Sequence, residues 1–182
     1  MSDNQLIGLA EDFFQNSLDS SPTSAIMRGH KKYFDQIEEL TEDQFQKEKE
    51  TVDNFIQRLN AIEKDNLTNR EKVTHGMLEF ALSSNQDSLL DRSWEFGAGV
   101  SGFTGFLIDY NQQMFVPDSE SADMMLKRLE LYKRLYTQIA EVQKEGLNNN
   151  RVATERNLLR TIDQLENYLA SSLDQDPLLL VN

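Results

Sequence analysis

Long helices are the feature that most constrains the fold of this chain, because few prolines are present to interrupt them. The 182 residues include three prolines, at positions 22, 117 and 177. Between them, apolar residues recur at intervals of three and four, which is the spacing of one face of an α-helix. We therefore expect an all-α fold, a bundle of about five to seven mostly antiparallel helices.

Two four-residue patterns mark the starts of long helices. In Thr41-Glu42-Asp43-Gln44 and in Thr68-Asn69-Arg70-Glu71, a threonine is followed three residues later by Gln or Glu. The hydroxyl can accept a hydrogen bond from a backbone N–H of the first turn, while the longer side chain reaches back to the cap residue. The first of these helices is expected to bury Phe45, Val52, Phe55, Ile56, Leu59 and Ile62. The second is expected to continue through Val73, Met77, Phe80 and Ala81.

Other helix boundaries follow from proline, serine and glycine. Pro22 is expected to open a short helical turn that stops at Gly29. Ser119 or Ser121 is expected to cap a helix that ends at Gly146, where a missing Cβ suits a left-handed stop. A last helix should run from Val152 toward Pro177.

Composition excludes several classes of protein. The chain has no cysteine, which excludes thiol catalysis, disulfides and cysteine-ligated metals. The net charge is -13, so the field of the protein repels nucleic acids and anionic membrane surfaces. We expect neither nucleic acid nor membrane as a partner. Without a signal-like start or a long apolar run, the chain as given is expected to be soluble and cytoplasmic.

The segment 94–118 departs from the helical pattern. Four of the eight glycines lie there among aromatic residues. Gly97-x-Gly99-x-x-Gly102 formally fits a dinucleotide fingerprint, but no hydrophobic strand precedes it, and a tight bend or close helix packing is favoured. A glycine-rich aromatic loop can also be a lid or the wall of a ligand cleft. The candidate ligand or cleft-lining residues are Trp94, Phe96, Gly97, Gly99, Gly102, Phe103 and Phe106.

Histidine offers one weak metal hypothesis. His75 and Glu79 are four residues apart on a predicted helix and could face one ion. The only other imidazole is His30, and no third ligand is specified by spacing. A surface or cap-proximal role for His75 is therefore favoured, and we assign no catalytic, cofactor-binding or metal-ligating residue to this chain.

The order of short motifs resembles the bacterial domain-of-unknown-function family 885. The similarity runs over nearly the whole chain, although each motif by itself is a short helical pattern. The residues that carry it are Leu9 to Phe14, Ser21 to Ala25, Gly29, Tyr33, Asp35, Leu59 to Ile62, Leu67-Thr68, Ser121 to Asp123, Arg128-Leu129, Gly146, Arg151 to Ala153 and Gln164 to Glu166.

That resemblance implies where a zinc site would lie and which part of a longer protein this chain would be. Members of the family are usually about three times longer and look like zinc-dependent peptidases, with a His-Glu-x-x-His motif in their C-terminal part. Nothing in this chain matches the motif, so no zinc ligand is carried over to it. The resemblance implies that zinc belongs to a missing C-terminal part. Leu178 to Val181 would then lead into that part.

Two functions remain open. In the first, residues 1–182 form one helical domain, the non-catalytic N-terminal part of a metallopeptidase-like bacterial protein. It would supply a cleft wall or lid, and its partner would be the C-terminal catalytic domain of the same protein. In the alternative, the chain is a stand-alone helical bundle that binds a protein or peptide through the Gly/aromatic segment.

Overall fold

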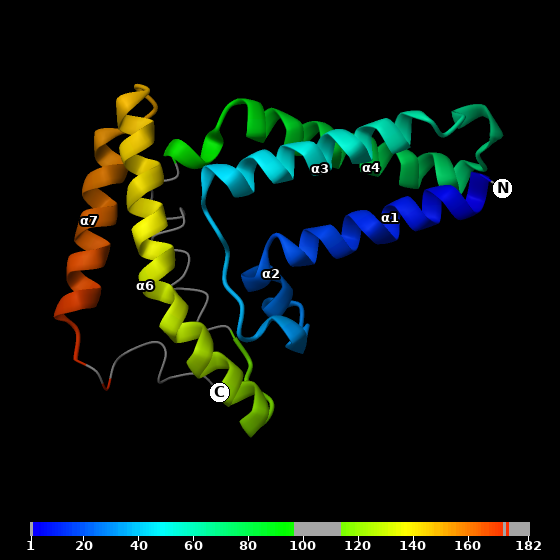
Figure 1. Ribbon diagram of the computed structural model, residues 1–182. Coiled ribbons are helices and arrows are strands. Elements are labelled where there is room, and N and C mark those ends of the chain that lie inside the picture. Colours follow the sequence, from blue (N-terminus) through cyan, green and yellow to red (C-terminus); the bar gives the residue numbers. More distant parts are fainter. Residues whose placement is uncertain (1, 97–113, 173, 175–182) are drawn as a thin grey trace. The chain divides into compact units, whose positions relative to one another are not determined.

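The computed structural model describes residues 2–96, 114–172 and 174, and all regular secondary structure in them is helical (Figure 1). This confirms the expected all-α class with five to seven helices. Six α-helices lie in the described part of the chain, together with the short 3-10 helices η1 (Lys31–Tyr33), η2 (Lys64–Asn66) and η3 (Ser93–Phe96). The α-helices are α1 (Ser2–Asp19), α2 (Pro22–Met27), α3 (Glu42–Asn60), α4 (Asn69–Leu90), α6 (Ser119–Asn148) and α7 (Glu155–Ala170).

The chain forms two compact units, and each unit is built from two separate stretches of sequence. Unit 1 comprises Met1–Ser20 and Thr41–Ser93, and unit 2 comprises Ser21–Leu40 and Trp94–Asn182. After α1 the chain therefore leaves unit 1, contributes Ser21–Leu40 to unit 2, and returns to unit 1 at α3. The expectation of a single domain over residues 1–182 stays a prediction.

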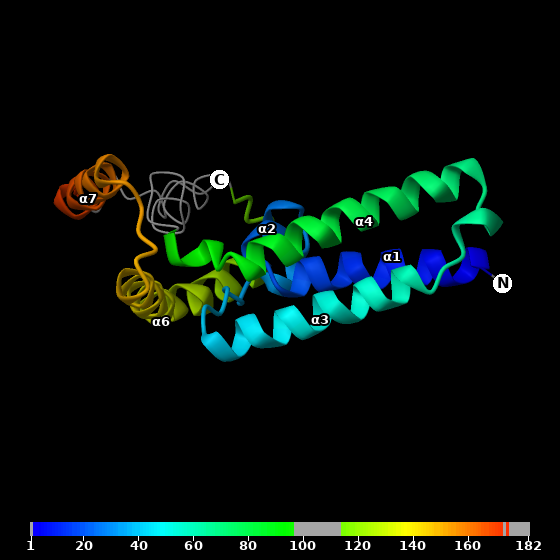
Figure 2. The ribbon, with the colours of Figure 1, turned by 90° about the horizontal axis from the view of Figure 1, so that it is seen from above.

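Unit 1 is a three-helix arrangement in which α1, α3 and α4 all contact one another (Figure 2). Its core contains Leu6, Leu9, Val52, Phe55, Leu59, Ile62, Leu67, Leu78 and Leu82. Of the stripe predicted for α3, Phe45, Val52, Phe55, Leu59 and Ile62 are buried, and Ile56 packs partly buried against the core. The helical spacing of apolar residues thus selected the correct face of α3.

Both predicted helix starts in unit 1 are confirmed. Thr41 accepts a hydrogen bond from the Gln44 N–H at 3.2 Å. Thr68 forms a complete capping box, because its hydroxyl accepts from the Glu71 N–H while the Glu71 carboxylate accepts from the Thr68 N–H at 2.6 Å. Each threonine satisfies a first-turn donor that has no partner within its own helix.

Unit 2 contains α2, η1, α6 and α7, with buried Tyr33, Phe34, Ile37, Leu135 and Ile139. Pro22 opens α2 as predicted, and Gly29 follows it with a φ of 84°, a conformation that an L side chain rarely adopts.

The cap of α6 differs from the prediction. Asp118, and neither Ser119 nor Ser121, is the N-cap, and its carboxylate accepts from the Ser121 N–H at 2.9 Å. Asp118 also pairs with the Lys31 ammonium. Hydrogen bonding to Lys31, and then to Ser121, holds the pKa of Asp118 below its usual range. An ionised carboxylate at this position also suits the positive end of the helix dipole, which favours Asp over serine.

Gly146 is not the predicted helix stop. It lies inside α6, and the left-handed residue after this helix is Asn150, with a φ of 57°. The reason for glycine is a close approach instead: a Cβ at position 146 would meet the backbone oxygens of Arg151 and Glu95 at 2.6 Å each. The local pattern located the end of the helix within a few residues but missed the long-range contact.

Within the described residues, every helix is too short or too polar to cross a membrane.

Candidate functional site

The Gly/aromatic segment was the leading candidate site, and two of its named residues are described. Trp94 and Phe96 both lie on η3, where Trp94 is half-buried and Phe96 is 39% exposed. Gly97, Gly99, Gly102, Phe103 and Phe106 lie outside the described residues. Of the candidate site, the structure therefore describes only the two residues on η3.

An ion pair between a buried carboxylate and a half-buried arginine holds η3 in place. The Glu95 side chain is fully buried, and its carboxylate accepts a hydrogen bond from Arg151 Nη1 at 2.9 Å. Arg151 follows α6, and its own N–H donates to the Gly146 carbonyl at 2.7 Å. Glycine at position 146 lets the Glu95 backbone approach this turn, so η3 is held against the C-terminal end of α6.

His75 is buried, contrary to the favoured surface role. It is 2% exposed and lies on the core side of α4 with Leu78 and Leu82, because positions 75, 78 and 82 share one helical face. Its Nε2 atom has no hydrogen-bond partner in the described part of the chain. The predicted neighbour Glu79 is near, with its Oε2 atom 4.0 Å from His75 Nδ1.

The Glu79 carboxylate is paired with a lysine. Lys64 Nζ donates to both carboxylate oxygens at 3.0 Å each. These hydrogen bonds and the nearby positive charge lower the pKa of Glu79. Among the described residues, no group of three His, Asp or Glu side chains is arranged to hold a metal ion.

The sequence did not reveal a buried polar cluster in unit 2 that joins α2 to α6. Arg128 is fully buried, donates through Nη2 to Thr23 Oγ1 at 2.5 Å, and donates through Nη1 to the Gln36 carbonyl. Thr23 in turn donates to Glu38, through its N–H at 2.9 Å and its hydroxyl at 2.7 Å. The buried guanidinium and the buried carboxylate thus share one threonine.

This cluster is suited to positioning rather than to proton transfer. Each Glu38 oxygen already accepts a hydrogen bond from Thr23, and the guanidinium has only donors, two of which are engaged by Thr23 and the Gln36 carbonyl. The only sequence signal was the motif Arg128-Leu129, which indicates nothing about burial by itself.

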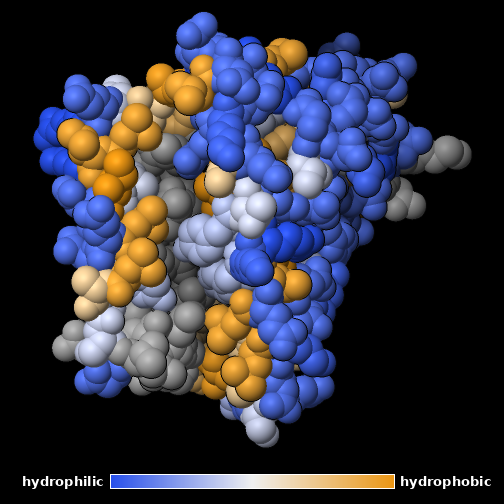
Figure 3. All heavy atoms as spheres, turned by 60° about the vertical axis from the view of Figure 1, so that its left-hand side comes forward, coloured by the Kyte–Doolittle hydropathy of each residue, from blue (hydrophilic) through white to orange (hydrophobic). Residues whose placement is uncertain are grey.

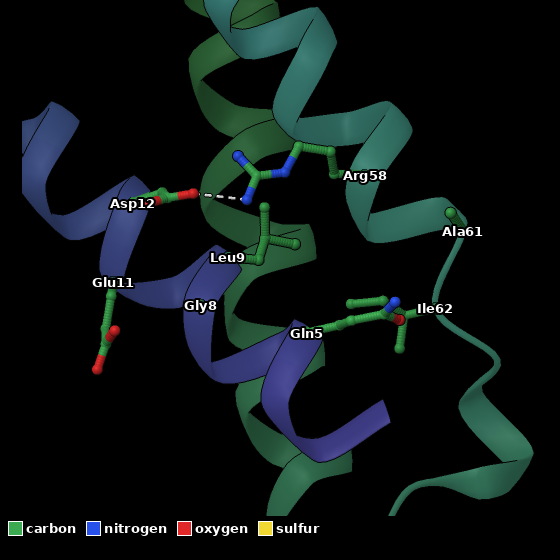
Figure 4. Close-up of a pocket in the computed structure, with 8 residues that line it drawn as sticks. All are labelled: Gln5, Gly8, Leu9, Glu11, Asp12, Arg58, Ala61 and Ile62. Carbon is green, nitrogen blue, oxygen red and sulfur yellow. Dashed lines mark hydrogen bonds and ion pairs between the residues drawn. The ribbon is translucent and has the colours of Figure 1, made fainter. Parts of the chain in front are cut away.

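An open hollow of about 430 Å³ lies between α1 and α3 in unit 1 (Figure 4). Gly8 and Ala61, both without long side chains, leave room for it, and Leu9 and Ile62 supply apolar wall. Across it, Arg58 Nη2 donates to Asp12 Oδ2 at 2.6 Å. Because both partners of that pair are exposed, it contributes at most about 1 kcal/mol to stability.

Helix α7 presents an apolar face to solvent. Leu158, Leu159, Ile162 and Leu169 are 37 to 79% exposed, while the only buried residue of this helix in the described structure is Thr161, at 6% exposed. Figure 3 shows hydrophobic side chains gathered along α7. Residues 158, 162, 165 and 169 follow the spacing of four and three that packs one helix on another.

One protein-family model matches most of the chain. A family model described as "Bacterial protein of unknown function (DUF885)" matches residues 22–181. The chain belongs to this family. The match covers residues 41–93 of unit 1 and all of unit 2 except its first and last residues, so it includes Thr23, Glu38 and Arg128, whereas α1 precedes it. Comparison with curated proteins and with solved structures finds no match.

Proposed function

We propose that this DUF885 chain is the non-catalytic, N-terminal helical part of a larger protein that resembles a zinc-dependent metallopeptidase. In that protein it forms a wall or lid of the cleft, next to a C-terminal catalytic domain. Membership of the family over residues 22–181 supports the architecture. The metallopeptidase character rests on the resemblance given above.

The observation that carries the proposal is the exposed apolar face of α7. Burial of apolar surface contributes about 25 cal/mol per Å², and contiguous exposed patches on a protein mark sites that another surface covers. Leu159 and Ile162 are about half exposed and Leu169 is 79% exposed, so a further domain would find there a ready surface to pack on. A wall built on α7 would shape a cleft without supplying the catalytic groups.

One experiment tests whether the chain is non-catalytic, as proposed. The purified 182-residue chain is incubated with a peptide library in the presence of zinc, and hydrolysis is followed by mass spectrometry. We expect no turnover. Robust turnover that EDTA abolishes would overturn the proposal, because the chain would then be an enzyme by itself.

A second experiment tests the packing half. The gene is sequenced beyond the codon for Asn182, and the downstream region is produced together with this chain. We expect a continuing reading frame whose product co-purifies with the chain. The charged substitution Ile162→Glu on α7 should abolish co-purification, while the matched substitution Met77→Glu on α4 should leave it intact. A stop codon directly after Asn182 would contradict this function.

A specific observation keeps the second function as a candidate. Both aromatic residues that flank the undescribed part of the Gly/aromatic segment are exposed, Phe96 at 39% and Phe115 at 69%. Exposed aromatic rings are frequent anchors in recognition surfaces. Since Trp94 is the only tryptophan, its fluorescence reports on this segment. A peptide ligand should shift the emission, and an emission that no candidate peptide changes would exclude this function.

A further inference from the structure

Helix α4 of unit 1 has two apolar faces, of which one is buried in the unit and the other is exposed. His75, Leu78 and Leu82 lie on the buried face. Val73, Met77 and Phe80 are 63, 69 and 78% exposed and share the opposite face, since residues three, four and seven apart on a helix are neighbours. A helix that is apolar on both sides is typical of one packed between two partners.

We propose that this outer face of α4 pairs with the same face of a second copy of the chain, antiparallel and around a twofold axis between Leu78 and Glu79. A twofold interface must be self-complementary, so each residue has to suit the residue at the mirrored position of the other copy. About this axis, Met77 lies opposite Phe80 of the second copy, and Phe80 opposite its Met77. The two most exposed apolar residues of the face therefore meet at its centre.

Charge complementarity selects a second copy as the occupant. In the same register, Arg70 lies opposite Asp87 of the second copy, and the symmetry repeats this pair at the other end of the interface. Both side chains are exposed, and neither has an ion-pair partner among the described residues. Each lies about 13 Å along the helix from the axis, so a shallow crossing near 20° keeps the pairs within reach.

Small residues on this face permit the close approach. Gly76 is exposed, a Cβ there would meet nothing within 4 Å, and it lies opposite Ala81 of the second copy. Val73 lies opposite Ser84, which is also small and exposed. Helices with small residues at their contact pack at the shorter end of the usual interaxial distances of about 8–10 Å.

The size of the face sets the strength of the dimer. Helix α4 has 22 residues, about 33 Å, with three large apolar side chains on its outer face. Such an interface lies at or under the lower end of the roughly 1,200–2,000 Å² that stable complexes bury. The net charge of -13 adds long-range repulsion between copies. We therefore expect reversible dimers at concentrations between about 10 μM and 1 mM.

The test is sedimentation equilibrium of the full chain at about 0.15 M salt, where long-range repulsion is screened beyond roughly 8 Å. The wild-type chain should dimerise, and Met77→Glu should be monomeric because it buries a charge at the axis. Ile162→Glu on α7 is the matched control and should dimerise like the wild type. A wild-type chain that stays monomeric up to about 1 mM, or a Met77→Glu chain that still dimerises, would overturn the proposal.

Charge reversal then tests the register. Arg70→Asp and Asp87→Arg should each weaken dimerisation at least roughly tenfold, because each places like charges opposite each other twice. An equimolar mixture of the two variants should recover the dimer, since every pair in the mixed species is again opposite in charge. Both substitutions favour the helix dipole of α4, so loss of the dimer is not loss of the helix. A mixture no more dimeric than its components would refute this register and with it the proposed pairing.

Discussion

Arg128 is a fully buried arginine, so breaking its hydrogen bonds carries a large free-energy cost. It bonds Thr23 and the Gln36 carbonyl, and through Thr23 it is linked to the buried carboxylate of Glu38. We predict that Arg128→Met lowers the free energy of unfolding by roughly 3–5 kcal/mol, because it leaves Glu38 buried without the compensating charge. Urea denaturation measures the change.

Two further variants make that prediction specific. Arg134→Met is the control, since Arg134 is exposed and 4.0 Å from Glu39, and it should change stability by no more than about 0.5 kcal/mol. The double variant Arg128→Met with Glu38→Gln should lose less than the sum of its single losses, since it no longer strands a charge. Additive losses would mean that the two charges are not coupled through Thr23.

Gly146 carries a second prediction at the scale of one residue. A Cβ there meets two backbone oxygens at 2.6 Å, and a backbone cannot move aside as a flexible side chain can. Gly146→Ala should therefore lower the free energy of unfolding by about 1–3 kcal/mol. Gly8→Ala is the matched control, because Gly8 lies inside helix α1 and a Cβ there would meet nothing within 4 Å. This substitution should raise the free energy of unfolding by about 0.5–1 kcal/mol. Equal effects at both positions would contradict the close-approach explanation.

Glu48 gives a prediction for pH. Burial on α3 raises the pKa of this carboxyl above 4.5, so the folded state favours the protonated form. The contribution of Glu48 to stability is thus present at low pH and is lost as pH rises through the raised pKa. Glu48→Gln should raise Tm at pH 7 and have little effect below about pH 3, which is more than a unit under the unfolded-state pKa, so that both states carry a neutral carboxyl. Thermal melts at both values measure this, with exposed Glu141→Gln unchanged at either.

At the scale of elements, local chemistry determined what the sequence could predict. The starts of α3 and α4 were predictable because Thr41 and Thr68 bond donors only three residues ahead. The cap of α6 was missed by one residue, because Asp118 and the neighbouring serines all fit a capping position and the pairing with Lys31 is not a local signal. Which face of α4 is buried could not be predicted either, since this helix has apolar residues on two sides.

The polar cluster could not be predicted, for a reason that also belongs to this scale. Arg128 bonds partners that are 92 and 105 residues away in the chain, on segments that the fold brings together. Helical periodicity places arginine by default on a solvated face, and no pattern within one helix distinguishes the buried case. The same limit applies to Glu95, whose buried carboxylate pairs with Arg151, 56 residues away in the chain.

At the scale of the whole molecule, the interleaved units decide which parts of the chain can exist alone. Every residue of the unit 1 core, from Leu6 to Leu82, comes from α1, α3, α4 or the short link between α3 and α4. The stretch Ser21–Leu40 contributes nothing to that core and instead buries Tyr33 and Phe34 in unit 2. Unit 1 thus has the elements of an independent three-helix protein, and its sequence is interrupted by residues 21–40, which belong to unit 2.

This leads to a prediction about a shortened chain. Residues 1–20 joined to residues 41–93 by a Gly/Ser linker of about ten residues, which spans roughly 17 Å, should fold cooperatively. Its circular dichroism should be helical and its thermal unfolding should follow one transition, because its core is complete. The uninterrupted chain 1–93 should aggregate more readily, since it lacks the rest of unit 2, in which Ile26, Tyr33, Phe34 and Ile37 are buried. A linked chain without cooperative unfolding would mean that unit 1 depends on contacts outside its own core.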